Sequence, residues 1–161
     1  MKSANILDAF FLSNPLYRGM IEMIILVGTG ICGLVFSWKA FPVFPFSRML
    51  GGVLILLAVG FHGWAHKQHK QAHKDSKEIE TIVTTGAFSK IRHPLYLSII
   101  PMNIGIALAF GIRVTFILAL LTIIHWVLTA LKEEEALMKS FPVEYGRYKQ
   151  QVRWRMIPWI F

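Results

Sequence analysis

Arg92-His93-Pro94 stands where a long apolar stretch of the chain begins. A proline fits the first turn of a helix, because its N–H would have no partner there, and the residue before it is biased away from the helical region. The triplet therefore predicts a helix that starts at Pro94. The unpaired N–H groups and positive dipole end of such a helix suit an anion. Arg92 and His93 would add donors there, unless the triplet is a plain helix cap with Arg92 reaching the headgroups.

Three consecutive carboxylates, Glu133, Glu134 and Glu135, follow the last apolar stretch. Neighbouring like charges repel each other, and adjacent positions point to different faces of a helix. One or two of them should therefore point inward at a cationic group of the protein or of a ligand; the alternative is a solvated charge run. The anion site and this acidic site would together suit a small zwitterionic cofactor that also carries a positive charge.

Four histidines recur at spacings of four, three and four residues: His62, His66, His69 and His73. This spacing places them on one face of a helix. Imidazoles one turn apart can share a metal ion, so a metal site is one interpretation. Lysines are interleaved with them, so a row that lines a polar pocket, or one that lies at the membrane surface, is also open. His125 lies inside the last apolar stretch, where we expect a hydrogen bond to another helix.

The elements that must position these groups are membrane helices. Of the 161 residues, 55% are hydrophobic and 16% are charged, and the mean hydropathy is +0.52. Several stretches approach the roughly 20 apolar residues that cross a bilayer. We predict an all-α integral membrane protein with about four transmembrane helices, the last two a helical hairpin, whose cytoplasmic connecting and C-terminal segments form a pocket. The spans are expected at about residues 19–38, 49–65, 95–110 and 114–131.

The positive charges orient this bundle. Fourteen of the 17 lysines and arginines lie before the first span or in the segments 66–93 and 132–161. The positive-inside rule therefore places both termini and both polar segments in the cytoplasm, which in a bacterium means the inner membrane. The net charge of +8 follows this topology, so we expect the lipid bilayer, and not nucleic acid, as a partner. Aromatic residues beside basic ones also predict a C-terminal anchor at the interface: Tyr145, Tyr148, Trp154 and Trp159.

The motifs themselves resemble a known family. The stretch "TTGAFSKIRHPLYLS", followed about 40 residues later by "EEEALMKSFPVEYGRYKQQV", is similar to the isoprenylcysteine carboxyl methyltransferases, and related phospholipid methyltransferases share the pattern. The resemblance covers about residues 66–158. It implies a single membrane methyltransferase domain over residues 1–161. Such an enzyme uses S-adenosyl-L-methionine to methylate a membrane-resident or lipophilic small acceptor, a carboxylate, amine or thiol, at the cytoplasmic membrane face.

The resemblance also implies which residues contact the cofactor. Carried over position by position, they are His73, Glu80, Thr81, Ile82, Val83, Phe88, His93, Pro94, Leu95, Tyr96 and Glu133. The chain departs from the pattern at Phe88, where the family usually has tyrosine, and at Leu97-Ser98, which replace a common small residue. It departs again at Thr129, where a substrate-contacting arginine falls.

The reaction implied is direct transfer of an already activated methyl group, which requires alignment and exclusion of water. A carboxylate acceptor needs no base, whereas an amine or thiol must lose a proton, for which Glu134 or His73 could serve. Arg92 and Glu134 are accordingly the candidate catalytic residues, and no metal ligand is assigned. Two other classes stay open: a metal-dependent membrane oxidase or hydroxylase built on the histidine row, and a membrane scaffold without enzymatic activity.

Overall fold

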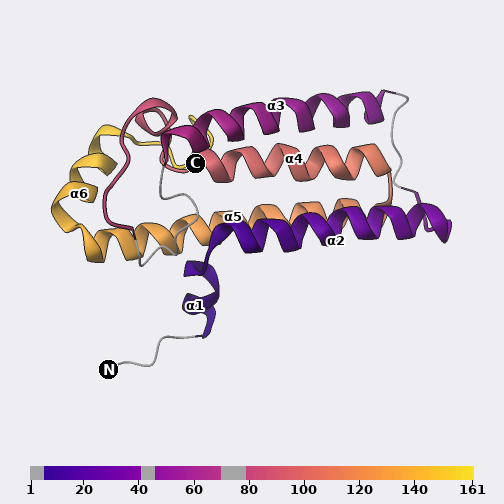
Figure 1. The fold of residues 1–161 in the computed structure, drawn as a ribbon, viewed down its shortest axis with the longest axis horizontal. Helices are drawn as coiled ribbons and strands as arrows, with labels where there is room; N and C mark the ends of the chain where they lie inside the picture. The colour runs from indigo at the N-terminus through magenta and orange to yellow at the C-terminus, as the bar shows by residue number, and fades with distance from the viewer. Residues whose placement is uncertain (1–5, 41–45, 70–78) are drawn as a thin grey trace.

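The protein is a bundle of long helices with a smaller helical cap at one end (Figure 1). A computed structural model describes residues 6–40, 46–69 and 79–161. The α-helices are α1 (Ile6–Leu12), α2 (Pro15–Val35), α3 (Ser47–Gln68), α4 (Pro94–Phe110), α5 (Arg113–Ser140) and α6 (Pro142–Gln151), and the 3₁₀-helix η1 spans Gly86–Ser89. The described residues form isolated β-bridges and no longer strand. The all-α prediction is confirmed.

The helices have the length and composition of membrane spans. Three of them, α2, α3 and α5, are long and apolar enough to cross a bilayer. The apolar helix α4 is shorter, with 17 residues, which is about 26 Å at 1.5 Å per residue. Large hydrophobic side chains such as Ile24 and Leu56 are exposed on the outside of the bundle, which is where lipid belongs. These features agree with a membrane protein of about four transmembrane helices.

Two helices extend beyond the membrane spans expected for them. Helix α2 spans Pro15–Val35. It begins at Pro15 because the Asn14 side chain caps its start by accepting from the N–H of Leu16. Helix α5 continues past the predicted end at residue 131 to Ser140. Its 28 residues span about 42 Å, which exceeds the roughly 30 Å hydrocarbon core. Because the apolar part of α5 ends at Leu131, the glutamates that follow lie beyond the hydrocarbon.

Helix α4 lies between α3 on one side and the α2–α5 pair on the other, and the α4–α5 turn forms the predicted hairpin (Figure 1). Gly111 ends α4 in the left-handed conformation, with φ of 68°. The α3–α4 contact is so close that only a glycine fits at position 51. A Cβ there would lie 2.6 Å from the carbonyl oxygen of Gly105. Two glycines thus bring the backbones of α3 and α4 together.

Polar side chains join α2 to α5 inside the bundle. Arg18, 5% exposed, donates to the Thr129 hydroxyl at 2.8 Å. The indole N–H of Trp126 donates to Glu22 at 2.7 Å, and His125 Nε2 lies 3.5 Å from the same carboxylate. The expected helix-to-helix contact of His125 is confirmed.

The predicted C-terminal anchor is wrong for two of its aromatic residues. Tyr145 and Tyr148 are 1% and 4% exposed, and they pack with Leu137 in a hydrophobic cluster of the cap. The Tyr148 hydroxyl donates to the Phe88 carbonyl at 2.7 Å. The reason is that α6 folds back against the segment that begins at residue 79, so its aromatic side faces inward. Trp159, by contrast, is 86% exposed.

Candidate active site

The Arg-His-Pro triplet starts a helix, as predicted. Helix α4 begins at Pro94, and His93 precedes it in a non-helical conformation, with φ of −125° and ψ of 62°. The backbone N–H groups of Arg92 and His93 donate to the carbonyls of Trp154 and Arg155 at 2.9 and 2.7 Å. The C-terminal segment therefore fixes the position of both residues.

The guanidinium of Arg92 is held by the protein itself. Its Nε donates to Glu134 Oε1 at 2.8 Å, and its Nη1 donates to the carbonyls of Val152 and Arg153, both at 2.7 Å. Glu134 also lies 3.2 Å from the Nε of Arg155. The two residues predicted to be catalytic thus form a buried ion pair with each other.

His93 lies between the two inward-pointing glutamates. Its Nδ1 is 3.5 Å from Glu133 Oε2, and its Nε2 is 3.4 Å from Glu134 Oε1. The imidazole stacks on the ring of Tyr96 with centroids 5.3 Å apart. Glu135, in contrast, is exposed and pairs with Lys132. The expectation that one or two of the three carboxylates face a cationic group is confirmed.

These contacts set the charges at the end of the bundle. Burial alone disfavours the imidazolium of His93, but contacts with Glu133 and Glu134 outweigh it and raise the pKa of His93 above its ordinary value of 6.5. Burial likewise opposes ionisation of Glu134, yet His93 and Arg92 prevail and lower its pKa to about 2. The pKa of Glu133 is also lowered, because His93 outweighs the effect of burial. At neutral pH the cluster therefore carries both signs of charge.

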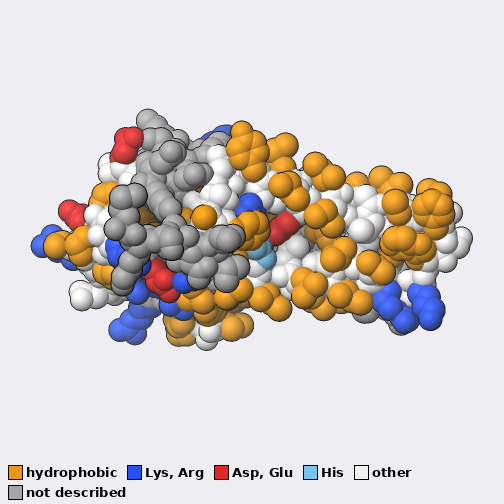
Figure 2. Space-filling view, turned by 90° about the horizontal axis from the view of Figure 1, so that it is seen from below, with side chains coloured by type: hydrophobic (Ala, Val, Ile, Leu, Met, Phe, Trp, Pro, Cys, Tyr) orange, Lys and Arg blue, Asp and Glu red, His pale blue; other side chains and the backbone are white. Residues whose placement is uncertain are grey.

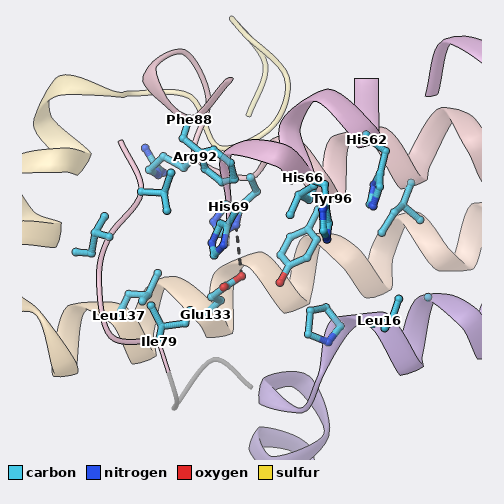
Figure 3. A pocket seen from close by; sticks show the side chains of 18 of the residues that line it. Leu16, His62, His66, His69, Ile79, Phe88, Arg92, Tyr96, Glu133 and Leu137 are labelled. Atoms are coloured by element: carbon cyan, nitrogen blue, oxygen red, sulfur yellow. Dashed lines mark ion pairs between the residues drawn. The ribbon is translucent and has the colours of Figure 1, made fainter. Parts of the chain in front are cut away.

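A cavity of about 410 Å³ opens beside this cluster and extends between the spanning helices. Its wall comprises side chains from α2, α3, η1, α4, α5 and α6, from the segment just before α4, and from residues 79 and 81–83. Figure 3 shows Glu133 pointing into it from α5, with His62 and His66 entering from α3 and His69 from the residue that follows α3. Nine residues predicted for the site line it: Thr81, Ile82, Val83, Phe88, Arg92, His93, Leu95, Tyr96 and Glu133.

Other predicted residues lie elsewhere. Glu80 is exposed, and neither it nor the buried Pro94 lines the cavity. Glu134 does not line the cavity, because its carboxylate is bound by the guanidinium of Arg92. His73 falls outside the described residues. Among the histidines, His62, His66 and His69 do line the cavity, as one interpretation of their spacing predicted.

Comparison with known proteins identifies the family. A family model described as phospholipid methyltransferase matches residues 46–144. The chain belongs to this family. Phospholipid methyltransferases are related to the isoprenylcysteine carboxyl methyltransferases, so the resemblance in the motifs is confirmed at the level of the family. No curated protein matches the sequence.

Sequence reasoning missed part of the site of this phospholipid methyltransferase family member. Leu16, Gly19, Met20 and Met23 of α2 line the cavity, and the match to the family begins only after α2. Their spacing of three and four residues marks one face of a helix. An apolar helix face suits lipid and cavity equally well, so the spacing could not tell which of the two it contacts.

Proposed function

We propose that this membrane methyltransferase transfers a methyl group from S-adenosyl-L-methionine to a lipophilic small acceptor at the cytoplasmic membrane face. One observation carries the proposal: the cavity has a charged pair, His93 with Glu133, at one end and apolar side chains of spanning helices at the other. A charged, water-soluble methyl donor and a lipid-soluble acceptor would each find a matching end.

The charged end fits the donor. The imidazolium of His93 would attract its carboxylate, and Glu133 would attract its ammonium and sulfonium groups. Phe88, Ile82 and Val83 offer apolar contact for its adenine base. The cavity volume lies in the range of small-molecule sites, roughly 300–1,000 Å³. When bound, the donor supplies a methyl group already activated by positive sulfur.

The apolar end fits an acceptor that arrives from the bilayer. Leu16, Met20 and Val59 line the cavity and are also 41%, 51% and 55% exposed on the outside of the bundle. Side chains that face both the cavity and the lipid surround a route by which an acyl or prenyl tail can stay in hydrocarbon. The acceptor's nucleophile is then a carboxylate, an amine or a thiol, with an isoprenylcysteine among the compounds to test.

We assign Arg92 and Glu134 to positioning, because their contacts join the triplet to α5 and to the C-terminal segment. Their buried ion pair holds His93 and Glu133 in place without using either side chain on the ligand. The orientation with both termini in the cytoplasm is part of the proposal and rests on the charge distribution. Reporter fusions after Ser47 and Ser76 should read outside and inside respectively.

Titration with S-adenosylhomocysteine tests the donor site. Glu133→Gln should weaken binding to the purified protein by about 1 to 3 kcal/mol, the range for a hydrogen bond to a charged group. His93→Ala should weaken it similarly, provided that melting of the unliganded variant shows that it is folded. The control is Glu135→Gln on the exposed neighbour, which should bind like the parent.

Failure of the parent protein to bind S-adenosylhomocysteine would reject the proposal and leave a membrane scaffold. Metal analysis of the same preparation tests the oxidase alternative, because that class requires a stoichiometric bound metal ion. The acceptor is identified by incubating membranes with methyl-labelled S-adenosylmethionine and separating the labelled lipids.

A further inference from the structure

His62 and Ser98 form a hydrogen-bonded pair in the apolar half of the cavity. Ser98 belongs to α4 and is 2% exposed, and His62 belongs to the neighbouring α3. His62 Nδ1 lies 2.7 Å from the Ser98 hydroxyl oxygen. His62 also lines the cavity, about two turns along α3 from His69. Figure 3 shows this end of the pocket on the far side of Tyr96 from Glu133.

The contacts of Ser98 decide which nitrogen of His62 carries the proton. A serine hydroxyl has one hydrogen, and Ser98 donates it to the carbonyl oxygen of Leu95 at 2.5 Å. The hydroxyl oxygen must then accept from His62, so the proton of the neutral imidazole is on Nδ1. Nε2 is consequently the proton-accepting nitrogen of this ring. In sites that activate a nucleophile, the base is commonly oriented by a third group, and Ser98 orients His62 in this way through Nδ1.

We infer that His62 is the general base that takes the proton of an ammonium acceptor, with Ser98 as its positioning residue. This inference rests on the proposed function. Charged Glu133 is a weak base because its pKa is lowered, and the contacts of His93 with Glu133 and Glu134 raise its pKa and so favour its protonated form. A tautomer-fixed histidine at the lipid-facing end is therefore the better placed acceptor of protons.

The step balances as follows. The ammonium group of the acceptor gives one proton to His62 Nε2 and becomes a neutral amine. The amine nitrogen then forms a bond to the methyl carbon, the carbon–sulfur bond breaks, and its electron pair stays on sulfur as a neutral thioether. The product is a methylammonium group, and the proton on His62 leaves to water.

The histidine row provides a direction for that proton. The rings of His62 and His66 stack with centroids 6.2 Å apart, and His69 follows at the end of α3. Residues three and four apart lie one above the other on a helix. The row thus leads from the apolar half of the cavity toward the charged end. The titratable and charged groups that line the same cavity are His66 and His69 from α3, Arg92 and His93 before α4, Tyr96 from α4, Glu133 from α5, and Tyr145 and Tyr148 from α6.

Nuclear magnetic resonance of ¹⁵N-histidine-labelled protein tests the tautomer without any ligand. The ring signal that disappears in His62→Gln belongs to His62. In the parent it should show a protonated Nδ1 and an unprotonated Nε2, and in Ser98→Ala this single tautomer should give way to a mixture. An Nε2-protonated ring in the parent would overturn the inference.

Transfer from methyl-labelled S-adenosylmethionine to phosphatidylethanolamine vesicles tests the role. His62→Gln should lower the rate at least about 100-fold, the lower range for a general base, while S-adenosylhomocysteine affinity stays at the parent value. The deficit should shrink as pH rises, because more of the amine is then already deprotonated. Ser98→Ala should show a smaller deficit with the same pH trend.

Leu56→Ala is the control, since Leu56 belongs to the same helix as His62, is 74% exposed and does not line the cavity. It should transfer at close to the parent rate. A His62→Gln protein as active as this control at every pH would overturn the inference. A parent protein that binds no S-adenosylhomocysteine and labels no lipid would instead reject the proposed function.

Discussion

Two clusters of arginine, glutamate and histidine, buried or half-buried, lie in the described part of the chain, and they differ in what they face. The site cluster lies at the start of α4 and consists of Arg92, His93, Glu133 and Glu134. The bundle cluster joins α2 to α5 and consists of Arg18, Glu22 and His125. Figure 2 shows acidic, basic and histidine atoms within an otherwise largely hydrophobic face of the bundle.

The clusters differ in the cavity that they line, because Glu22 and His125 line a separate and smaller hollow of about 200 Å³. Three members of the site cluster line the 410 Å³ cavity, whereas no member of the bundle cluster does. The side chains of the bundle cluster instead form hydrogen bonds between helices: Arg18 donates to Thr129, and Glu22 accepts from Trp126. Residue type alone therefore does not distinguish a ligand site from a contact between helices. Three measurements test this distinction, in order of decreasing expected effect.

Glu134→Ala should have the largest effect on stability. It leaves the guanidinium of Arg92, 7% exposed, without its carboxylate partner. Breaking a buried ion pair from one side costs about 3–5 kcal/mol. Chemical unfolding in detergent should show this loss, whereas Glu135→Ala on the exposed neighbour should change stability by less than about 0.5 kcal/mol. Equal effects of the two substitutions would mean that Arg92 and Glu134 do not support the cap.

Trp126→Phe should have an intermediate effect, confined to stability. It removes the 2.7 Å hydrogen bond to Glu22 while it keeps an aromatic ring at the position. Loss of a hydrogen bond to a charged group predicts a decrease of about 1 to 3 kcal/mol in the free energy of unfolding. Titration of the folded variant should give the parent affinity for S-adenosylhomocysteine. A weaker affinity would show that the bundle cluster acts on the cavity.

The pH dependence of melting should give the smallest effect. Glu134 has its pKa lowered to about 2 from the model-compound value of 4.5, so its stabilising contribution is present above pH 4.5 and is lost as pH falls toward 2. His93 has a raised pKa, so its contribution is present below pH 6.5 and is lost as pH rises through the raised value. The melting temperature should fall by a few degrees on each side. Glu134→Gln should reduce the acid-side decline to the part that Glu133 contributes, because the pKa of Glu133 is also lowered. A decline as large as in the parent would assign it to another group.

The sequence predicted the parts of the fold that depend on local signals. Hydropathy located the four long helices, and Pro94 marked the start of α4 because a proline restricts its neighbours directly. The sequence put the last span's end at residue 131 and the glutamates that follow on a helix, but it did not locate the end of that helix at Ser140, since charged residues end a membrane span without ending a helix. Charge marked the membrane boundary, whereas the helix ends just before Phe141-Pro142, where the proline disfavours a helical conformation of the residue before it.

The site was predictable where a short motif carried it and not where the fold brought distant residues together. His93 and Glu133 follow from the motifs, and they do line the cavity. From the sequence, Arg92 was as good a candidate to bind a ligand, but its guanidinium donates to carbonyls about 60 residues further along the chain. Tyr145 is of a residue type that is common at the membrane interface, and only the return of α6 toward the bundle buries it. Such long-range pairings leave no local trace in the sequence.

The bonds from Arg92 and His93 to the carbonyls of Trp154 and Arg155 also set an order of events during biogenesis. Synthesis proceeds from the N-terminus, so α2 to α5 can enter the membrane before residues 152–156 have left the ribosome. The backbone that holds His93 gains these partners only after the last span is inserted. A nascent chain stalled after α5 should therefore be membrane-embedded but lack the backbone partners that hold Arg92 and His93.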